Sequence, residues 1–176
     1  MHPLAEPQMM FRNVAIVASV LFGCQAAAQA PYQLVFQDEF DGTALDTDIW
    51  EPMIGNGQNY GLAGWGNNES QYYTDLPSNV SVADGKLSIT ARQQSYMGYN
   101  YTSARLRTQN NLDIRYGRIE ARMKLPSTQG IWPAFWMLPT NSPYGGWAAG
   151  GEIDIMESVN QADRVHGTLH FGGQWP

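Results

Sequence analysis

The sequence predicts an all-β protein built from short antiparallel strands packed as a sandwich. Short segments of alternating apolar and polar residues are separated by Gly, Asn and Pro, which is typical of such sandwiches. After residue 30, no segment keeps apolar residues at helical spacing over the length of a helix. The composition agrees, because 18 glycines and 12% aromatic residues are typical of a turn-rich β protein. With 176 residues, 43% hydrophobic and 15% charged, the chain can form one folded domain with a sizeable core.

The first 30 residues have the features of an export signal. The apolar run VAIVASVLFG (14–23) is too short to span a bilayer. The following AAAQA places small residues at Ala28 and Ala30, the pattern that precedes signal-peptide cleavage. We therefore expect a signal peptide over residues 1–30, a mature domain over residues 31–176, and a secreted or periplasmic location.

The only cysteine offers an alternative form of export. Cleavage after Ala30 removes Cys24 and leaves a mature domain without thiols or disulfides. LFGC at 21–24, however, resembles a bacterial lipobox, whose cysteine is acylated. In that case the protein is lipid-anchored through Cys24.

The charge of the chain excludes two classes of partner. The formal net charge is -6 and the isoelectric point is about 4.9. Nucleic acids and anionic membrane surfaces attract basic patches, so neither is expected to bind here. We also expect no membrane-spanning segment. An acidic surface suits a neutral ligand but does not identify one.

Two patterns predict individual strands. KLSITA (86–91) alternates Leu87, Ile89 and Ala91 inward, and an Asp84-Gly85 turn joins it to VSV at 80–82. The longest alternation is DIRYGRIEARMKL (113–125), which Pro126 ends. We expect the first pair to form a hairpin and the second segment to form a long strand.

Three segments combine the side chains that line sugar sites. WGNNESQYY (65–73) and GYNYTSARL (98–106) mix aromatic rings with Asn, Gln and Arg. Aromatic faces stack on pyranose rings, and planar polar groups bond their hydroxyls. IWPAFWML (131–138) adds Trp132 and Trp136, which share one face of an extended segment. A core position is the alternative for both tryptophans.

GEIDIMESV (151–159) carries three carboxylates. Alternation places Glu152 and Asp154 on one strand face, and a β-bulge at Ile155-Met156 returns Glu157 to the same face. Such a row repels itself, and three interpretations remain open at this point. It is a solvated outer face, a cation site, or the carboxylate pair of a glycoside hydrolase, in which like charge raises the pKa of the proton-holding acid.

A series of motifs resembles one enzyme family. E-x-D-x-x-E after Gly is similar to the active-site signature of glycoside hydrolase family 16, in particular its bacterial endo-β-1,3-glucanases (laminarinases). The resemblance extends in the same order through FQDEFDG (36–42), WGNNESQYYT (65–74), YTSARL (101–106), YGRIEARMKLP (116–126), GIWPAFWMLP (130–139) and GTLHFGG (167–173). It implies a concanavalin A-like jelly-roll β-sandwich with a concave glycan-binding cleft, and hydrolysis of β-1,3-glucan with retention by double displacement.

The resemblance also implies roles for individual residues. Glu152 corresponds to the nucleophile, Glu157 to the acid/base, and Asp154 to a residue hydrogen-bonded to the nucleophile. Positions similar to glucan-binding residues are Trp132, Trp136, Arg105, Asn68 and His170. We expect His170 on the neighbouring strand, facing Glu157, with a purely structural histidine as the alternative.

The family implies no cofactor for catalysis, but it often carries a structural calcium. Glu39 and the Gly85 carbonyl are expected to contribute, although the C-terminal aspartate of the family pattern is absent from this chain. Family members continue for several strands beyond the position of Pro176, so we expect the fold of these 176 residues to be incomplete at the C-terminus. A monomer is expected for the full-length form.

Two other functions remain compatible with the sequence. A glucan-binding module without catalysis keeps the aromatic residues but does not need all three acids. A mixed-linkage glucanase or a transglycosylase of the same family keeps both the aromatic residues and the three acids.

Overall fold

The computed structural model describes residues 32–173, and its regular elements are almost all β-strands. Two 3-10 helices are the only helices in this part of the chain, and neither has the length and apolar character needed to cross a membrane. The export signal, Cys24 and their alternatives lie outside the described residues. In chain order the elements are β1 (Glu51–Pro52), η1 (Gln58–Tyr60), η2 (Ala63–Gly66), β2 (Gln71–Tyr73), β3 (Val80–Ala83), β4 (Lys86–Ile89), β5 (Arg92–Tyr96), β6 (Tyr99–Ser103), β7 (Leu106–Arg107), β8 (Ala134–Met137), β9 (Glu152–Glu157) and β10 (His166–His170).

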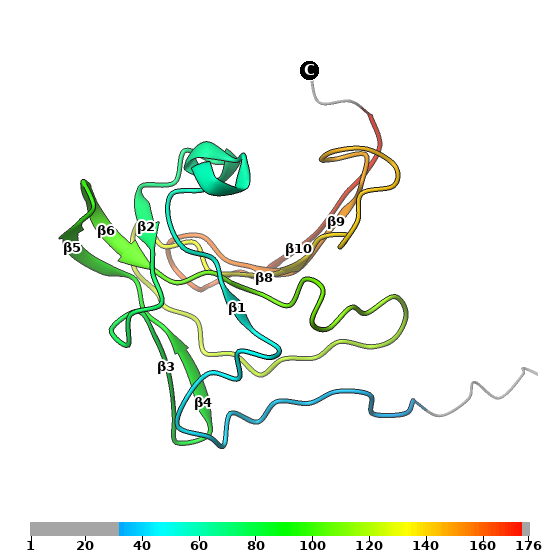
Figure 1. Cartoon of the computed structure of the whole chain (residues 1–176), viewed down its shortest axis with the longest axis horizontal. Helices are drawn as coiled ribbons and strands as arrows, with labels where there is room; N and C mark the ends of the chain where they lie inside the picture. Colours follow the sequence, from blue (N-terminus) through cyan, green and yellow to red (C-terminus); the bar gives the residue numbers. More distant parts are fainter. Residues whose placement is uncertain (1–31, 174–176) are drawn as a thin grey trace, which may run out of the picture. The chain divides into compact units, whose positions relative to one another are not determined.

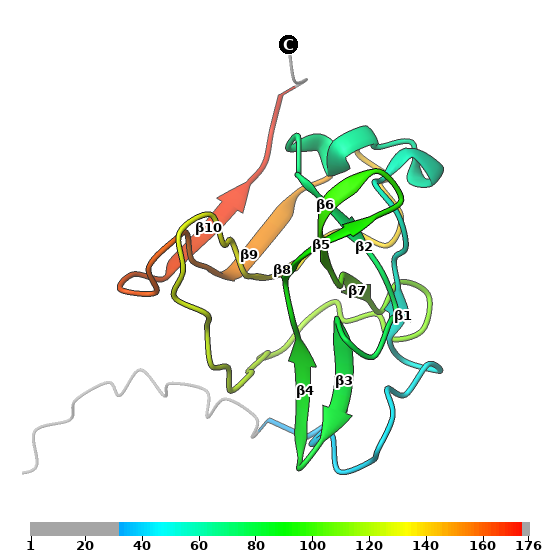
Figure 2. The same ribbon diagram turned by 90° about the vertical axis from the view of Figure 1, so that its left-hand side faces the viewer.

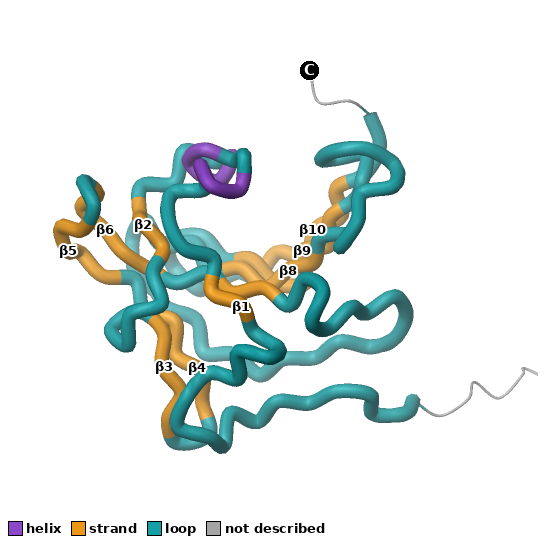
Figure 3. Tube along the Cα trace, viewed as in Figure 1, coloured by secondary structure: helices purple, strands orange, loops and turns teal. Residues whose placement is uncertain are grey.

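The strands form four small sheets joined by long loops (Figure 3). Strands β10, β9 and β8 lie side by side as one antiparallel sheet (Figure 1 and Figure 2). A second sheet has the order β2-β6-β5, in which β2 and β6 run parallel. Two antiparallel pairs, β1 with β7 and β3 with β4, complete the set. The predicted all-β class is therefore confirmed.

The predicted hairpin of β3 and β4 is also confirmed. Val80 pairs with Ile89, and the Asp84-Gly85 turn has positive φ at both residues, 52° and 67°. This is the turn geometry that Asp-Gly favours, because glycine adopts positive φ without steric cost. Val80 and Val82 are buried, whereas Ile89 is 51% exposed, Ala91 is exposed and Leu87 is only partly buried. The prediction that Ile89 and Ala91 pack inward was therefore wrong, since nothing covers them among the described residues.

The predicted long strand at 113–125 was wrong. This segment has no regular secondary structure and runs as a thin yellow-green coil in Figure 1. Gly117 interrupts it at a φ of 137°, and within residues 32–173 no neighbouring strand pairs with it. Alternation defines the two faces of an extended segment, but a strand also needs hydrogen-bond partners along its edge.

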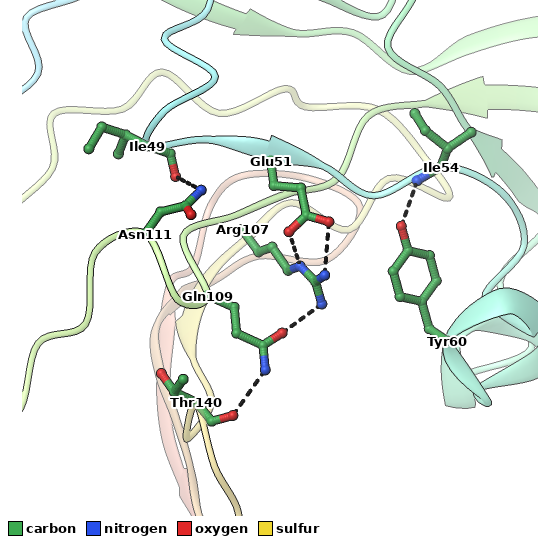
Figure 4. A network of polar contacts seen from close by, with 8 residues as sticks. All are labelled: Ile49, Glu51, Ile54, Tyr60, Arg107, Gln109, Asn111 and Thr140. Atoms are coloured by element: carbon green, nitrogen blue, oxygen red, sulfur yellow. Dashed lines mark hydrogen bonds and ion pairs between the residues drawn. The ribbon is translucent and has the colours of Figure 1, made fainter.

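A bidentate ion pair joins β1 to β7 (Figure 4). The Arg107 guanidinium donates to both carboxylate oxygens of Glu51, at 2.7 and 2.8 Å. It also donates to Gln109, whose side-chain amide donates onward to the backbone carbonyl of Thr140. The hydrogen bond from Arg107 lowers the pKa of Glu51, and the same contact raises the pKa of Arg107. The network connects β1 and β7 to the loop that follows β8.

Buried polar side chains hold β3, β4 and β6 together. Asn79 and Thr102 are fully buried. The Asn79 amide donates to the Thr90 carbonyl at 2.8 Å and to the Thr102 hydroxyl at 3.0 Å, and its oxygen accepts from Thr74 at 2.6 Å. A buried polar network is stabilising only when every member is satisfied.

We expect Asn79→Ala to destabilise the protein by about 2–3 kcal/mol, because it leaves Thr74, Thr102 and the Thr90 carbonyl without their buried partner. Urea denaturation followed by circular dichroism measures the change. Ser81→Ala, an exposed change two residues along the chain in β3, is the matched control and should be near neutral. Equal midpoints for the two variants would contradict the structural role of Asn79.

Candidate active site

A bulge in β9 places the three carboxylates on one face. On β10, His166 lies opposite Glu157 and His170 lies opposite Glu152, so four steps of β10 match five steps of β9. The register with β8 shifts at the same place, between Phe135 and Trp136. The extra residue therefore lies in β9 between Asp154 and Glu157. The predicted bulge at Ile155-Met156 is confirmed from both neighbouring strands.

Asp154 is the most buried of the three acids. Its side chain is 2% exposed, and its Oδ2 lies 3.1 Å from Nε2 of His170. The prediction that His170 faces Glu157 was wrong. Because β9 and β10 run antiparallel, the residue opposite Glu157 is His166, and His170 lies at the other end beside Glu152 and Asp154.

Glu152 has a hydrogen-bond partner that the sequence analysis did not single out. The indole N–H of Trp147 donates to its Oε2 at 2.6 Å, and the Trp147 ring lies 5.4 Å from the His170 ring. Burial raises the pKa of Glu152 above its usual value, and the Asp154 carboxyl adds to the rise. The Trp147 N–H and the His170 imidazole oppose it, since both favour the ionised form.

A glycine-rich turn before β9 allows the Trp147 side chain to reach Glu152 on that strand. Gly145 and Gly151 have φ values of 116° and 88°, which side-chain-bearing residues rarely adopt. A Cβ on Gly150 would lie 3.0 Å from the Gly145 carbonyl, so the turn also depends on the absence of a side chain there. A Trp followed by small residues just before an acidic strand is the signal from which Trp147 could have been predicted.

Glu157 is bonded by Trp132. The indole N–H of Trp132 donates to its Oε1 at 2.8 Å, although the Trp132 side chain is 58% exposed. Asn160 holds the preceding segment in place. Its side chain accepts from Gly130 at 2.7 Å, and its backbone N–H donates to Ile131 at 2.8 Å. The expected binding residue Trp132 thus lies directly at the acids.

Arg105 and Trp136 form a second group beside the acids. Trp136 pairs with Asp154 and so lies on the same sheet face as the carboxylates. The Arg105 guanidinium lies over the Trp136 ring at 4.8 Å and over the Trp65 ring at 4.6 Å, and it contacts Glu69 at 3.9 Å. Both tryptophans of the 131–138 segment therefore lie on the acidic face, as predicted.

Asn68 is exposed, in the turn between η2 and β2, with a φ of 53°. It directly precedes Glu69, whose carboxylate accepts hydrogen bonds from Tyr73 at 2.7 Å and Gln71 at 2.6 Å. Burial raises the pKa of the Tyr73 hydroxyl, and the charge of Glu69 raises it further. Asn68 is thus next to the Arg105 group, and no contact with the acids is assigned to it.

The expected calcium residues lie close together. The Glu39 carbonyl and the Asp41 carboxylate both lie 3.8 Å from the position that a Cβ of Gly85 would occupy. Backbone carbonyls and carboxylates are the oxygen ligands that calcium prefers. Two oxygen atoms of this type thus lie near Gly85, and Asp41 is a further candidate beside Glu39.

The geometry supports carboxylate chemistry on a sheet face that also carries aromatic residues. Three acids share one face, and each has a ring nitrogen as neighbour: Trp147 for Glu152, His170 for Asp154 and Trp132 for Glu157. Within residues 32–173, no Lys or Arg forms an ion pair with any of the three. A nucleophile, its neighbour and a proton donor can be drawn from this set without a metal ion.

Comparison with known proteins identifies the family. A family model described as "XgeA-like, catalytic GH16 domain" matches residues 67–175. The chain belongs to glycoside hydrolase family 16. It is 47% identical over 159 residues to glucan endo-1,3-beta-glucosidase A1 of Niallia circulans, covering 85% of this chain and 23% of that protein. It is 45% identical over 179 residues to a beta-glucanase of Rhodothermus marinus, covering 96% and 60% respectively.

The fold agrees with that family. The structure matches the catalytic domain of an endo-1,3-beta-glucanase (laminarinase) from Thermotoga petrophila with a TM-score of 0.74 and 48% identity, over 81% of this chain and 57% of that one. The expected jelly-roll β-sandwich class is thereby supported by a solved relative. The chain spans less than two thirds of the length of each of these proteins.

The raised pKa of Glu152 predicts a pH-dependent stability difference. The folded state holds this proton more tightly than the unfolded chain, so stability is lost as pH rises from the ordinary carboxyl pKa through the raised one. Glu152→Gln removes the charge and keeps an acceptor for Trp147. We expect the variant to melt higher than the wild type at neutral pH and at the same temperature below about pH 4.

Thermal melts across this pH range test the expectation. Asp163→Asn, in an exposed loop, is the matched control and should show no such pH dependence. A Glu152→Gln variant that melts lower than the wild type at neutral pH would contradict the assigned burial cost.

Proposed function

We propose that the protein is a retaining endo-glycosidase that hydrolyses β-1,3-glucan by double displacement. The observation that carries this proposal is the bulged β9, which brings Glu152, Asp154 and Glu157 to one face beside tryptophans. The laminarinase names of the relatives support the same substrate class. As a family 16 enzyme, the protein would bind a β-glucan polysaccharide as its substrate.

In the first step, Glu152 attacks the anomeric carbon while Glu157 gives its proton to the departing glycosidic oxygen. The bond to the leaving sugar breaks as the bond to the Glu152 oxygen forms. Glu152 must be ionised to attack, and the N–H of Trp147 stabilises that carboxylate. Trp132, bonded to Glu157, fixes the orientation of the proton donor.

In the second step, Glu157 has become a carboxylate and accepts a proton from water. The water oxygen attacks the anomeric carbon from the face that the leaving group vacated, and the Glu152 carboxylate is released. Asp154, bonded to His170, stays beside Glu152 throughout both steps. Two inversions at one carbon give net retention.

Substrate binding would depend on the aromatic residues. The exposed Trp132 offers an indole face to a sugar ring, and the Arg105 and Trp136 pair extends the same face of the sheet. Asn68 and His170 are proposed as further contacts. A neutral polysaccharide also suits a sheet face whose acids have no Lys or Arg partner among the described residues.

Product analysis tests the substrate and the mechanism together. We expect the full-length protein to release oligosaccharides from laminarin, with the β-anomer appearing first by proton NMR. Barley mixed-linkage glucan tests the lichenase-type alternative, and oligosaccharides longer than the substrate indicate transglycosylation. Binding of laminarin without products would support the glucan-binding module and overturn the enzyme.

Variants of Glu152 and Glu157 should differ in how much their turnover depends on the leaving group of the substrate. Glu157→Gln removes the proton donor and should lower turnover of laminarin about 10²–10⁴-fold, with a much smaller loss on an aryl glucoside whose leaving group needs no proton. Glu152→Gln removes the nucleophile and should lose more than about a thousandfold on both substrates, while laminarin binding survives. Equal losses on both substrates for Glu157→Gln would remove it from the acid role.

The bulge should matter for rate more than for folding. Deleting Met156 restores simple alternation and moves Glu157 one step closer to Asp154. We expect a folded protein with turnover lowered about 100-fold, because small displacements of catalytic groups are costly. Met156→Leu keeps the residue count and the apolar volume, and should stay near wild-type activity. Unchanged turnover in the deletion variant would show that the bulge does not position Glu157.

Three accompanying features are proposed with this function. A structural calcium would be held by Glu39, the Gly85 carbonyl and Asp41, far in sequence from the acids and without a part in the chemistry. Export to the periplasm or medium, or anchoring through Cys24, would bring the enzyme to an extracellular polysaccharide. The full-length form would act as a monomer.

A further inference from the structure

We propose that Glu152, Asp154 and His170 also form a binding site for a late first-row divalent cation, of which Zn²⁺ is the test case. Each residue offers one ligand atom, and these atoms all lie within 4.8 Å of one another. No other group of three such side chains was found among residues 32–173. The inference does not depend on the proposed function, because it concerns binding of the metal alone.

The spacing of the ligand atoms is close to what such an ion needs. Zinc binds imidazole nitrogen and carboxylate oxygen at about 2.0–2.2 Å, which puts two tetrahedral ligands about 3.4 Å apart. His170 Nε2 and Asp154 Oδ2 are 3.1 Å apart already. Glu152 keeps one oxygen on Trp147 and has a second oxygen for the metal. Glu152 thus supplies the third ligand atom, within 4.8 Å of the other two.

The electrostatic setting also favours a cation. Two carboxylates lie side by side on one sheet face, and in the described part of the chain neither has a Lys or Arg partner. The Asp154 side chain is 2% exposed, so its charge is poorly screened by solvent. The His170 side chain is 36% exposed, which leaves the site open to an ion from solution.

The mixed ligand set selects the type of metal. Imidazole suits Zn²⁺, Cu²⁺ and Ni²⁺, whereas Ca²⁺ and Mg²⁺ prefer sites made only of oxygen. The metal would take the Glu152 lone pair that a nucleophile uses. Occupancy of the site and attack by Glu152 therefore exclude one another.

Calorimetric titration of the full-length protein with ZnCl₂ tests the site, in calcium-containing buffer so that oxygen-only sites are already filled. We expect His170→Gln and Asp154→Asn each to weaken zinc binding at least tenfold. His166→Gln, which removes the other histidine of β10, should bind zinc as the wild type does. His2 and Cys24 are present in every variant, so any zinc affinity of theirs is a common background.

A spectroscopic and a thermal readout complete the experiment. Co²⁺ should give visible absorption bands in the wild type and His166→Gln, and lose them in His170→Gln. Zn²⁺ should raise the melting temperature of the same two proteins and not that of His170→Gln. If His170→Gln does not fold, Asp154→Asn and Glu152→Gln decide. Wild-type zinc affinity in those folded variants, or equal losses in His166→Gln and His170→Gln, would overturn the proposal.

Discussion

Strand β9 has to place three carboxylates on one face of its sheet and a methionine on the other, although their order in the sequence does not alternate. With simple alternation, Met156 would share the face of Glu152 and Asp154, and Glu157 would point to the apolar side. The bulge exchanges these two outcomes at once: Met156 is 7% exposed opposite Phe135, and Glu157 joins the acids. Burial of the Met156 side chain stabilises the fold by about 1.5–3 kcal/mol, and burial of the Glu157 carboxylate without a partner would cost more. Both effects favour the same register of β9.

The crowded acids are held by ring nitrogens rather than by lysine or arginine. Trp147 donates to Glu152, Trp132 donates to Glu157, and His170 bonds Asp154. A lysine or arginine in these positions would lower the pKa values and cancel the charge. Ring N–H groups orient the carboxylates and leave their charge in place. A nucleophile needs an oriented carboxylate that keeps its charge. The same uncancelled charge attracts a cation to this face of the sheet.

The sequence predicted the bulge because the spacing of Glu152, Asp154 and Glu157 leaves no other way to share a face. It failed for 113–125, where the alternation is longer, because a pattern specifies faces and not partners. His170 was placed on the correct strand but opposite the wrong acid, since the antiparallel pairing puts His166 opposite Glu157 and His170 opposite Glu152. Trp147 was missed because it lies in a glycine turn, where no periodicity marks a contact.

The strand ladder fixes the backbone of the acids, but two loops hold their side chains. Asn160 ties the segment before Trp132 to the end of β9, and the turn at 145–151 returns Trp147 to its beginning. If either loop moved away, the acids would stay on one face and regain rotamer freedom, which weakens a site that needs placement to within about 0.5 Å. On the reverse face Met156 is buried, whereas Ile153 and Leu169 are 46% and 64% exposed among the described residues. Burial of Met156 therefore helps to fix the register of β9, and hydrogen bonds from the loops fix the side chains of the outer two acids.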